Sequence, residues 1–229
     1  PNAPWTMPED EWESISLNYT SGTTGRPKGV VAHHRGAYLM TMGTVVSWRL
    51  QLYPKYLTIV PLFHCNGWNH TWMMPVLGGT VVCCRDITPA AIYDAIADEG
   101  VAYFGGAPIV LNMIVNAKDE DRRDFDHTVE VFTAGAPPAP ATLAAIESLG
   151  FNITQVYGLT ETYGHVTECV WDDKRWGELN GADRANIKAR QGVAFPMMED
   201  IAVLDGDMQP VNRDGATQGE IMIRGNSVM

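Results

Sequence analysis

The chain has 229 residues, a hydrophobic fraction of 45% and a formal net charge of −11. This length has room for one large domain or two small ones, and the acidic balance argues against nucleic acid as a partner. No apolar run approaches the roughly 20 residues that a membrane helix needs, and the first residues lack the basic-then-apolar pattern of a signal peptide. The four cysteines form no C-x-x-C pair, and we expect Cys83 and Cys84 to be buried and reduced, as in a cytoplasmic protein.

The first region of the chain predicts an extended segment at 14–18, a glycine-rich loop at 19–29 and then a short strand. A helix rich in Met, Leu and Val is predicted over 35–52, and the proline that follows closes this region. We expect residues 1–54 to form a partial sublobe that carries the loop.

Strands and helices alternate through the middle of the chain. Thr88 is a good N-cap with Pro89 at the first helical position, and Gly100 stops that helix. Such alternation predicts an α/β fold with a central parallel sheet flanked by helices, here over residues 55–164. The predicted strands are 57–60, 80–83, 101–104, 130–133 and 153–156, and the predicted helices are 67–77, 89–98, 108–117 and 140–149.

The pattern changes after residue 163. Residues 171–190 are polar with few periodic apolar positions, whereas 201–204 and 220–223 have the composition of strands and are separated by turn residues. We therefore expect residues 165–229 to form a small antiparallel β portion without helices.

The glycine-rich loop reads Y-T-S-G-T-T-G-R-P-K-G and suits a polyphosphate. Its glycines let backbone N–H groups approach an anion, its hydroxyls add donors, and Lys28 adds a mobile positive charge. The loop differs from the P-loop of NTPases, because Lys28 is displaced from the glycine and no Ser or Thr follows it. The residues expected to bind phosphate are Thr20, Ser21, Gly22, Thr23, Thr24, Gly25 and Lys28.

A second motif, Q-V-Y-G-L-T-E-T at 155–162, lies at the end of a predicted strand, where ligands of parallel α/β sheets gather. Tyr157 offers a flat face to a base, and Gly158 permits close approach. Thr160 offers a hydroxyl to a phosphate, and Glu161 is a hard oxygen ligand suited to Mg²⁺. Taken alone the pattern is weak, since Y-G before polar residues is common in turns.

Three further strand ends carry candidate residues. P-L-F-H-C-N-G-W at 61–68 places His64 in a loop, and Trp68 and Trp72 have the spacing of one helix face, so they would line a pocket or belong to the core. Without further context the segment T-A-G-A-P at 133–137 is explained better by an ordinary strand-to-helix turn, and G-G-A-P at 105–108 is explained equally well by one.

The loop sequence Y-T-S-G-T-T-G-R-P-K-G-V resembles the phosphate-loop signature of the adenylate-forming superfamily, which includes acyl-CoA synthetases, firefly luciferase and peptide-synthetase adenylation domains. Y-G-L-T-E resembles the second signature of that superfamily. The string F-H-C-N-G-W resembles plant-type acyl-activating enzymes and methylmercaptopropionate-CoA ligases, which favours a small or medium carboxylic acid. The resemblance runs from about Ser14 to the end of the chain.

The resemblance implies a role for each candidate. By this resemblance Tyr157 stacks on adenine beside a wall made by Gly135, Ala136 and Pro137, with Gly158 next to them. Thr160 contacts the α-phosphate, Glu161 holds the metal, and Lys28 and His64 join them in catalysis. The acid is expected to lie against His64, Trp68 and Gly106.

The implied activity is that of an AMP-forming acid–CoA ligase that uses ATP, Mg²⁺ and coenzyme A on a small-molecule carboxylic acid. Three alternatives stay open: adenylation for another thiol acceptor, a non-catalytic module that binds ATP or AMP, and a P-loop ATPase. No oligomeric state is predicted.

The same resemblance predicts that the isolated chain adenylates acids poorly or not at all, with thiol transfer weaker still. In the superfamily a T-G-D motif, a hinge and a small domain with a catalytic lysine would follow Met229. Pyrophosphate release with ATP, Mg²⁺ and a panel of acids measures this activity against a full-length relative. Turnover close to that of the relative would contradict the expectation.

Overall fold

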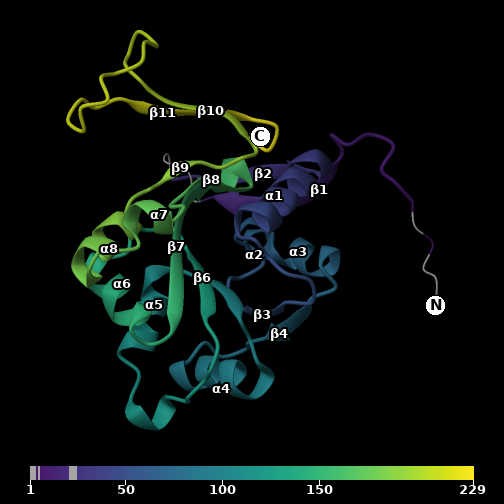
Figure 1. Ribbon diagram of the computed structural model, residues 1–229. Helices are drawn as coiled ribbons and strands as arrows, with labels where there is room; N and C mark the ends of the chain where they lie inside the picture. The colour runs from purple at the N-terminus through teal and green to yellow at the C-terminus, as the bar shows by residue number, and fades with distance from the viewer. Residues whose placement is uncertain (1–3, 5, 21–24) are drawn as a thin grey trace.

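The computed structural model describes Pro4, residues 6–20 and residues 25–229. Four predicted phosphate ligands, Ser21, Gly22, Thr23 and Thr24, lie outside the described residues. Within the described part of the chain the strands form one seven-stranded sheet and two two-stranded sheets. Figure 1 shows the large sheet at the centre, with the two-stranded sheets beside it.

The chain enters the fold through an antiparallel hairpin of β1 (Ser14–Thr20) and β2 (Lys28–His33), which confirms the predicted extended segment. The register places Thr20 opposite Lys28, so the two ends of the predicted loop lie side by side. Helix α1 (His34–Ser47) follows at once, because the His33 ring accepts the Gly36 N–H at 2.9 Å and caps it.

The large sheet confirms the predicted parallel α/β fold. Strands β4, β3, β5, β6 and β7 pair in parallel in that order, and β8 and β9 extend the sheet antiparallel. Its strands are β3 (Lys55–Thr58), β4 (Thr80–Cys83), β5 (Tyr103–Gly106), β6 (Val129–Thr133), β7 (Phe151–Leu159), β8 (Gly164–Glu168) and β9 (Val193–Ala194). The helical segments between them are α2 (Cys65–Trp68), α3 (His70–Val76), α4 (Pro89–Glu99), α5 (Pro108–Val115), η1 (Asp119–Asp121), α6 (Pro140–Glu147) and η2 (Thr160–Thr162).

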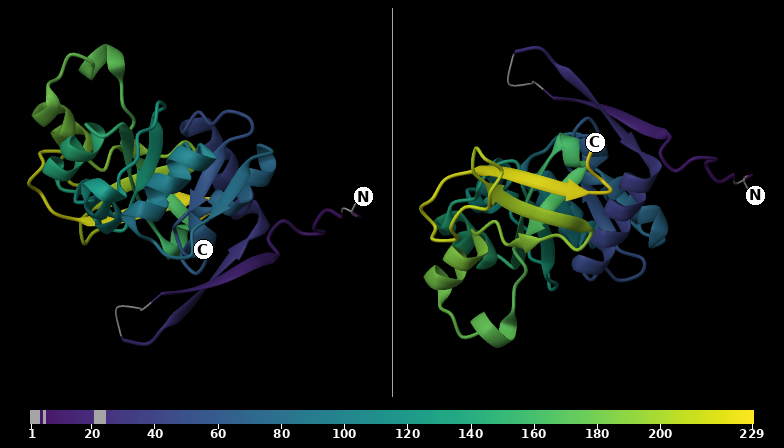
Figure 2. Two further views of the ribbon diagram at one scale, coloured as in Figure 1. Left: turned by 90° about the horizontal axis from the view of Figure 1, so that it is seen from below. Right: turned by 90° about the horizontal axis from the view of Figure 1, so that it is seen from above.

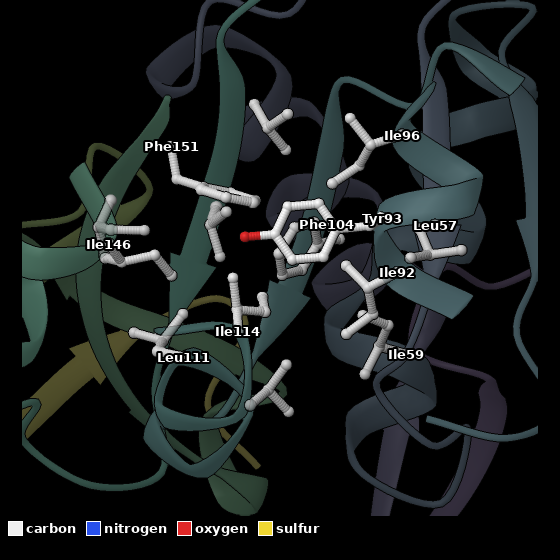
Figure 3. Packing of buried hydrophobic residues seen from close by; sticks show 14 of the residues in the cluster. Leu57, Ile59, Ile92, Tyr93, Ile96, Phe104, Leu111, Ile114, Ile146 and Phe151 are labelled. Carbon is white, nitrogen blue, oxygen red and sulfur yellow. The ribbon is translucent and has the colours of Figure 1, made fainter. Parts of the chain in front are cut away.

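Both faces of the inner parallel strands are buried, as such sheets require. On one face Phe104 and Phe151 pack with side chains of α4, α5 and α6, and Figure 3 shows Leu111 and Ile146 in this core. On the other face Phe132 packs in a second cluster with residues from α3 and from the end of α1. Successive strand residues point to opposite faces, so each strand serves both cores.

A second hairpin, β10 (Met198–Leu204) with β11 (Glu220–Gly225), confirms the predicted antiparallel portion. Figure 2 shows this hairpin in yellow and the β1–β2 hairpin in purple on the outside of the central sheet. No helix among the described residues combines the length and apolar composition that crossing a membrane would require.

The prediction of a helix-free region after residue 165 was wrong. Helices α7 (Asp173–Trp176) and α8 (Gly181–Lys188) lie there. Helix α8 begins behind Asn180, whose side chain accepts the Asp183 N–H at 3.2 Å. Its buried residues are the small Ala185 and the ion-paired Lys188, so the helix lacks the row of large apolar side chains by which apolar periodicity is recognised.

The expected burial of the adjacent cysteines was also wrong. Cys83 is exposed and Cys84 is half-buried. Cys83 ends β4, and β4 is the edge strand of the sheet, so its outer side has no neighbouring strand to cover it.

The buried side chain of Lys188 provides a stability test for α8. Its Nζ contacts the Glu147 carboxylate and donates to Asn152 Oδ1 at 2.6 Å. We expect Lys188→Ala to lower the unfolding free energy by about 2 kcal/mol, less than for a lone buried charge, because Arg184 still pairs with Glu147.

Urea denaturation of the two proteins measures the difference. The matched control is Lys118→Ala, since Lys118 is 76% exposed in its pair with Glu120 and its loss should cost about 0.5 kcal/mol or less. Equal losses in the two variants would contradict a supporting role for Lys188.

Candidate functional site

A cavity of about 510 Å³ lies at the carboxyl ends of β6 and β7, beside the β1–β2 hairpin and the turn that follows β3. Ligands of parallel α/β sheets bind at this edge, because the crossovers leave the strand ends open there. Of the residues predicted to bind phosphate or metal, the cavity wall includes Thr20, Lys28, Thr160 and Glu161, and it also includes Gly158, which was predicted to lie beside the base. Of the other predicted residues it includes Gly135, His64 and Trp68.

Five predicted residues that the structure describes do not line this cavity: Gly25, Gly106, Ala136, Pro137 and Tyr157. Gly106 is buried in β5, and Ala136 and Pro137 are exposed in the loop after β6. Tyr157 is half-buried between two lining residues of β7.

Gly158 has a structural use in addition to its place in the wall. A Cβ at this position would lie 2.0 Å from the carbonyl oxygen of Gly164 on β8. The missing side chain therefore lets β7 and β8 approach each other where the chain turns through η2, and any side chain at Gly158 would force these strands apart.

The cavity has a polar mouth and a buried floor. Lys28, His64 and Glu161 are exposed at the mouth, which brings a cation, an imidazole and a carboxylate together. Phe132 and His70 are buried and form part of the floor. The arrangement suits a ligand with a charged end in solvent-facing surroundings and a less polar end in the protein.

The turn that carries His64 has an unusual backbone. All five residues of 65–69 have positive φ, namely 40, 48, 69, 55 and 64°. Gly67 adopts this conformation freely and asparagine tolerates it, whereas Cys65 and Trp68 each pay a cost of roughly 1–2 kcal/mol. The helix predicted from residue 67 therefore begins only at His70, and Trp68 and Trp72 do not share one helix face.

A buried hydrogen-bond network holds this turn. Tyr163 Oη donates to Asn66 Oδ1 at 2.8 Å and accepts from Trp72 Nε1 at 3.1 Å and Ser16 Oγ at 3.2 Å. Asn18 Nδ2 also donates to Asn66 Oδ1, at 3.2 Å. The turn is thereby fixed to β1, which precedes the predicted phosphate loop, and to the segment that follows Glu161.

Cys65 is the thiol that lies in the cavity wall. Burial raises its pKa to about 11, although a hydrogen bond with Thr160 acts in the opposite direction. The group therefore stays a neutral thiol at neutral pH, which excludes it as a thiolate nucleophile. Its contact with Thr160 shows that the His64 turn and the η2 segment touch each other at the mouth.

The floor contains a buried tyrosine–histidine pair. The Tyr56 hydroxyl accepts the Gly105 N–H at 3.2 Å and forms a short hydrogen bond with His70 Nδ1. The Trp48 ring stacks on His70 with centroids 5.4 Å apart. Burial, and secondarily the charge of nearby His165, lowers the pKa of His70 to about 3, so its imidazole is neutral at physiological pH.

The metal-binding capacity of the cavity rests on one carboxylate. Among the described residues there is no group of three or more His, Cys, Asp or Glu side chains able to hold a metal ion by themselves. Glu161 at the mouth fits Mg²⁺, because this ion is usually held by one or two carboxylates together with phosphate oxygens and water.

The sequence reasoning missed several wall residues, among them Cys65, His70, Phe132 and His165. The available signal was position, since each lies within a few residues of a predicted strand-end motif. Residue type gave no help, because a buried histidine or phenylalanine is more often core than site.

Comparison with known proteins gives a consistent result. The family described as AMP-binding enzyme matches residues 2–229. An acetate/butyrate–CoA ligase of Arabidopsis thaliana, named as peroxisomal, is 48% identical over 231 residues, and an acetate–CoA ligase of Humulus lupulus is 49% identical over 231 residues. Both matches cover 100% of this chain, which spans 40% of the length of these curated relatives.

A solved structure shows the same fold. The O-succinylbenzoate coenzyme A synthetase of Bacillus subtilis, in complex with ATP and magnesium ion, matches with a TM-score of 0.77 over 96% of this chain and 43% of that chain. The sequence identity is 23%, so this likeness shows the fold alone.

His70 predicts a pH dependence of stability. Its folded pKa of about 3 lies below the ordinary 6.5, so between these values the unfolded chain binds the proton that the folded chain excludes. Stability is therefore fully present above the ordinary value and falls as the pH is lowered toward the folded pKa.

We expect His70→Phe to remove this dependence. The parent should lose about 2 kcal/mol more unfolding free energy than the variant between neutral pH and about pH 5. Denaturant unfolding at the two pH values measures it, and Tyr38→Phe, at an exposed ring, should keep the parent's slope. Parallel pH profiles of parent and His70→Phe would show that His70 takes up its proton as readily in the folded state as in the unfolded one.

Proposed function

The chain belongs to the family of AMP-binding enzymes, and we propose that it is the large-domain part of an AMP-forming acid–CoA ligase. One observation carries the proposal. Thr20 and Lys28 of the hairpin, Thr160 and Glu161 of the η2 segment and His64 of the turn after β3 converge on one cavity. These five side chains come from three regions far apart in the sequence and offer the donors, the charge and the carboxylate that ATP, Mg²⁺ and an acid require.

The proposed reaction has two steps. A carboxylate oxygen of the acid attacks the α-phosphorus of ATP, the bond to pyrophosphate breaks, and an acyl-adenylate forms. The thiol of coenzyme A then attacks the acyl carbon, its proton goes to solvent, and AMP leaves. Neither step needs a covalent bond to the protein, so the side chains act by position and charge.

The phosphate end of ATP would lie against the hairpin. Lys28 is exposed and carries a positive charge on a flexible stem, which suits the departing pyrophosphate. We include Ser21, Gly22, Thr23 and Thr24 in this site on the loop sequence alone.

The reacting phosphate would lie between the hairpin and η2. Thr160 offers its hydroxyl to the α-phosphate, and Glu161 would hold Mg²⁺. Mg²⁺ held there would neutralise the charge that develops on the leaving group.

The nucleotide base would occupy the exposed rim formed by the loop after β6 and the end of β7. Gly135 lines the cavity there, and Ala136 and Pro137 follow it on the same exposed loop. Tyr157, half-buried on β7, would supply the stacking face, and Gly158 the gap beside it.

The acid would extend from the mouth toward the floor. Its carboxylate would lie near exposed His64, and its chain would run past Trp68, with Gly106 in the strand behind. The buried floor limits the length of that chain and favours a small or medium acid. The names of the two plant relatives, which cite acetate and butyrate, support this size range.

Further parts of the proposal concern the whole protein. We propose a division at residues 1–54, 55–164 and 165–229, although the large sheet continues past residue 164 through β8 and β9. A cytoplasmic location agrees with the free thiols of the four cysteines, and the net charge argues against a nucleic-acid partner. Another thiol acceptor and a purely nucleotide-binding role are the alternatives that the test below separates.

Glu161 gives the sharpest test. We expect Glu161→Gln to lower ATP–pyrophosphate exchange in the intact protein by roughly 100- to 1,000-fold, because the neutral amide holds Mg²⁺ far less well. Isotope exchange with acetate or butyrate, over a range of Mg²⁺ concentrations, measures the effect. The variant should require more Mg²⁺ for half-maximal rate.

The matched control is Glu178→Gln, since Glu178 is an exposed carboxylate that does not line the cavity. Its exchange rate should equal that of the parent. Undiminished exchange in Glu161→Gln would contradict the assigned role, and nucleotide binding without any exchange in the parent would favour the non-catalytic alternative. Steady release of phosphate in place of pyrophosphate would point to an ATPase.

A further inference from the structure

His70 is a buried polar group that the proposed reaction does not use. It exposes 1% of its surface, and that surface faces the cavity, because His70 is one of the lining residues. Its surroundings are aromatic: Trp48 stacks on it, Trp68 meets it edge-on at 6.4 Å, and Phe132 lies 5.9 Å away. A polar ring at the floor of a largely aromatic pocket can form a hydrogen bond with a ligand that reaches the floor.

The hydrogen bonds around Tyr56 determine which nitrogen of His70 carries the proton. Burial raises the pKa of Tyr56, so its hydroxyl keeps its single proton. One lone pair of that oxygen already accepts the Gly105 N–H at 3.2 Å. Tyr56 is buried and does not line the cavity, so its hydroxyl hydrogen is paired only when Tyr56 donates to His70 Nδ1, whereas His70 itself borders the cavity.

With Nδ1 accepting, the proton of the neutral His70 ring lies on Nε2. This nitrogen has no hydrogen-bond partner among the described residues. The floor of the cavity therefore presents a neutral, fixed N–H donor, which attracts a neutral acceptor without also attracting a charge.

We propose that His70 is a specificity-determining residue that selects acids carrying a hydrogen-bond acceptor, such as a ketone or ether oxygen, at the far end of a short chain. The inference rests on the proposed function, since it takes the cavity to be the acid site. An alkyl chain of the same shape would cover the Nε2–H and leave it unpaired, whereas an acceptor would pair with it.

Tyr56 acts through His70 and is a positioning residue. Without its hydroxyl, nothing holds the His70 proton on Nε2, and the ring would divide between two tautomers. The selectivity should then weaken even though His70 itself remains. A merely structural role for Tyr56 would change the affinity for all acids alike and leave their ratio unchanged.

The test compares two acids of nearly the same shape in the intact protein. Levulinate carries a ketone oxygen where isocaproate carries a methyl group. Binding is followed by tryptophan fluorescence, because Trp48 and Trp68 both adjoin His70. We expect levulinate to bind about 3- to 10-fold more tightly, the effect of one neutral hydrogen bond.

Three variants separate the explanations. His70→Phe should abolish or reverse the preference, and Tyr56→Phe should reduce it. His70→Gln retains an N–H donor at a similar distance from the backbone and should keep part of the preference for levulinate. This variant also provides a test if His70→Phe does not fold. The ratio of the two dissociation constants is the readout, so a general loss of affinity does not affect the result.

Each outcome decides the question. Equal binding of the two acids by the parent, or an unchanged ratio in His70→Phe, would overturn the role of His70 while leaving the acid site intact. Binding of neither acid, together with no ATP–pyrophosphate exchange, would overturn the proposed function and this inference with it.

Discussion

Parallel pairing of β3, β5, β6 and β7 is the constraint on which the rest of this structure depends. Parallel neighbours cannot be joined by a tight turn, so each strand must be followed by a crossover that returns the chain to the opposite edge. The carboxyl ends of all four strands therefore share one edge, and helices cover both faces. His64 follows β3 and Glu161 follows β7, so both residues lie at that edge and line the same cavity although they are distant in the sequence.

The sheet alone does not determine how the side chains of His64 and Glu161 are oriented. The left-handed turn at 65–69 is strained, and it persists because Tyr163 and Asn66 bind each other inside a network that includes Ser16 and Asn18 of β1. Strand β1, which precedes the predicted phosphate loop, and the turn that carries His64 thus share one set of hydrogen bonds. A displacement of the β1–β2 hairpin would therefore also displace the turn. In the proposed reaction this connection would keep the groups for phosphate departure and those for acid attack in a fixed relative position.

The sequence predicted what local rules control. The N-cap Thr88 and the stop at Gly100 place α4 almost to the residue, since a side-chain cap and a left-handed glycine act within one turn of helix. Helix α8 was not predicted, because the burial of Lys188 depends on Glu147 and Asn152, which belong to other elements. The left-handed turn was not predicted for the same reason, since the hydrogen-bond partners of Asn66 lie about 50 and 100 residues away in the sequence. What the sequence missed was in each case decided by contacts between distant segments.

The cavity joins two electrostatic environments, and this contrast explains how one site would serve both ends of its ligands. At the mouth, Lys28 and Glu161 are exposed and charged, so the charge of a ligand there would be stabilised by solvent and protein and, in the proposed reaction, by Mg²⁺. At the floor, burial holds His70 neutral, and the N–H that we propose for it would discriminate by hydrogen bonding without drawing a carboxylate inward. A charged floor would compete with the mouth for the acid's carboxylate and reverse its orientation. In the proposed reaction, neutrality of the floor would therefore keep the reacting end of the acid beside the phosphate.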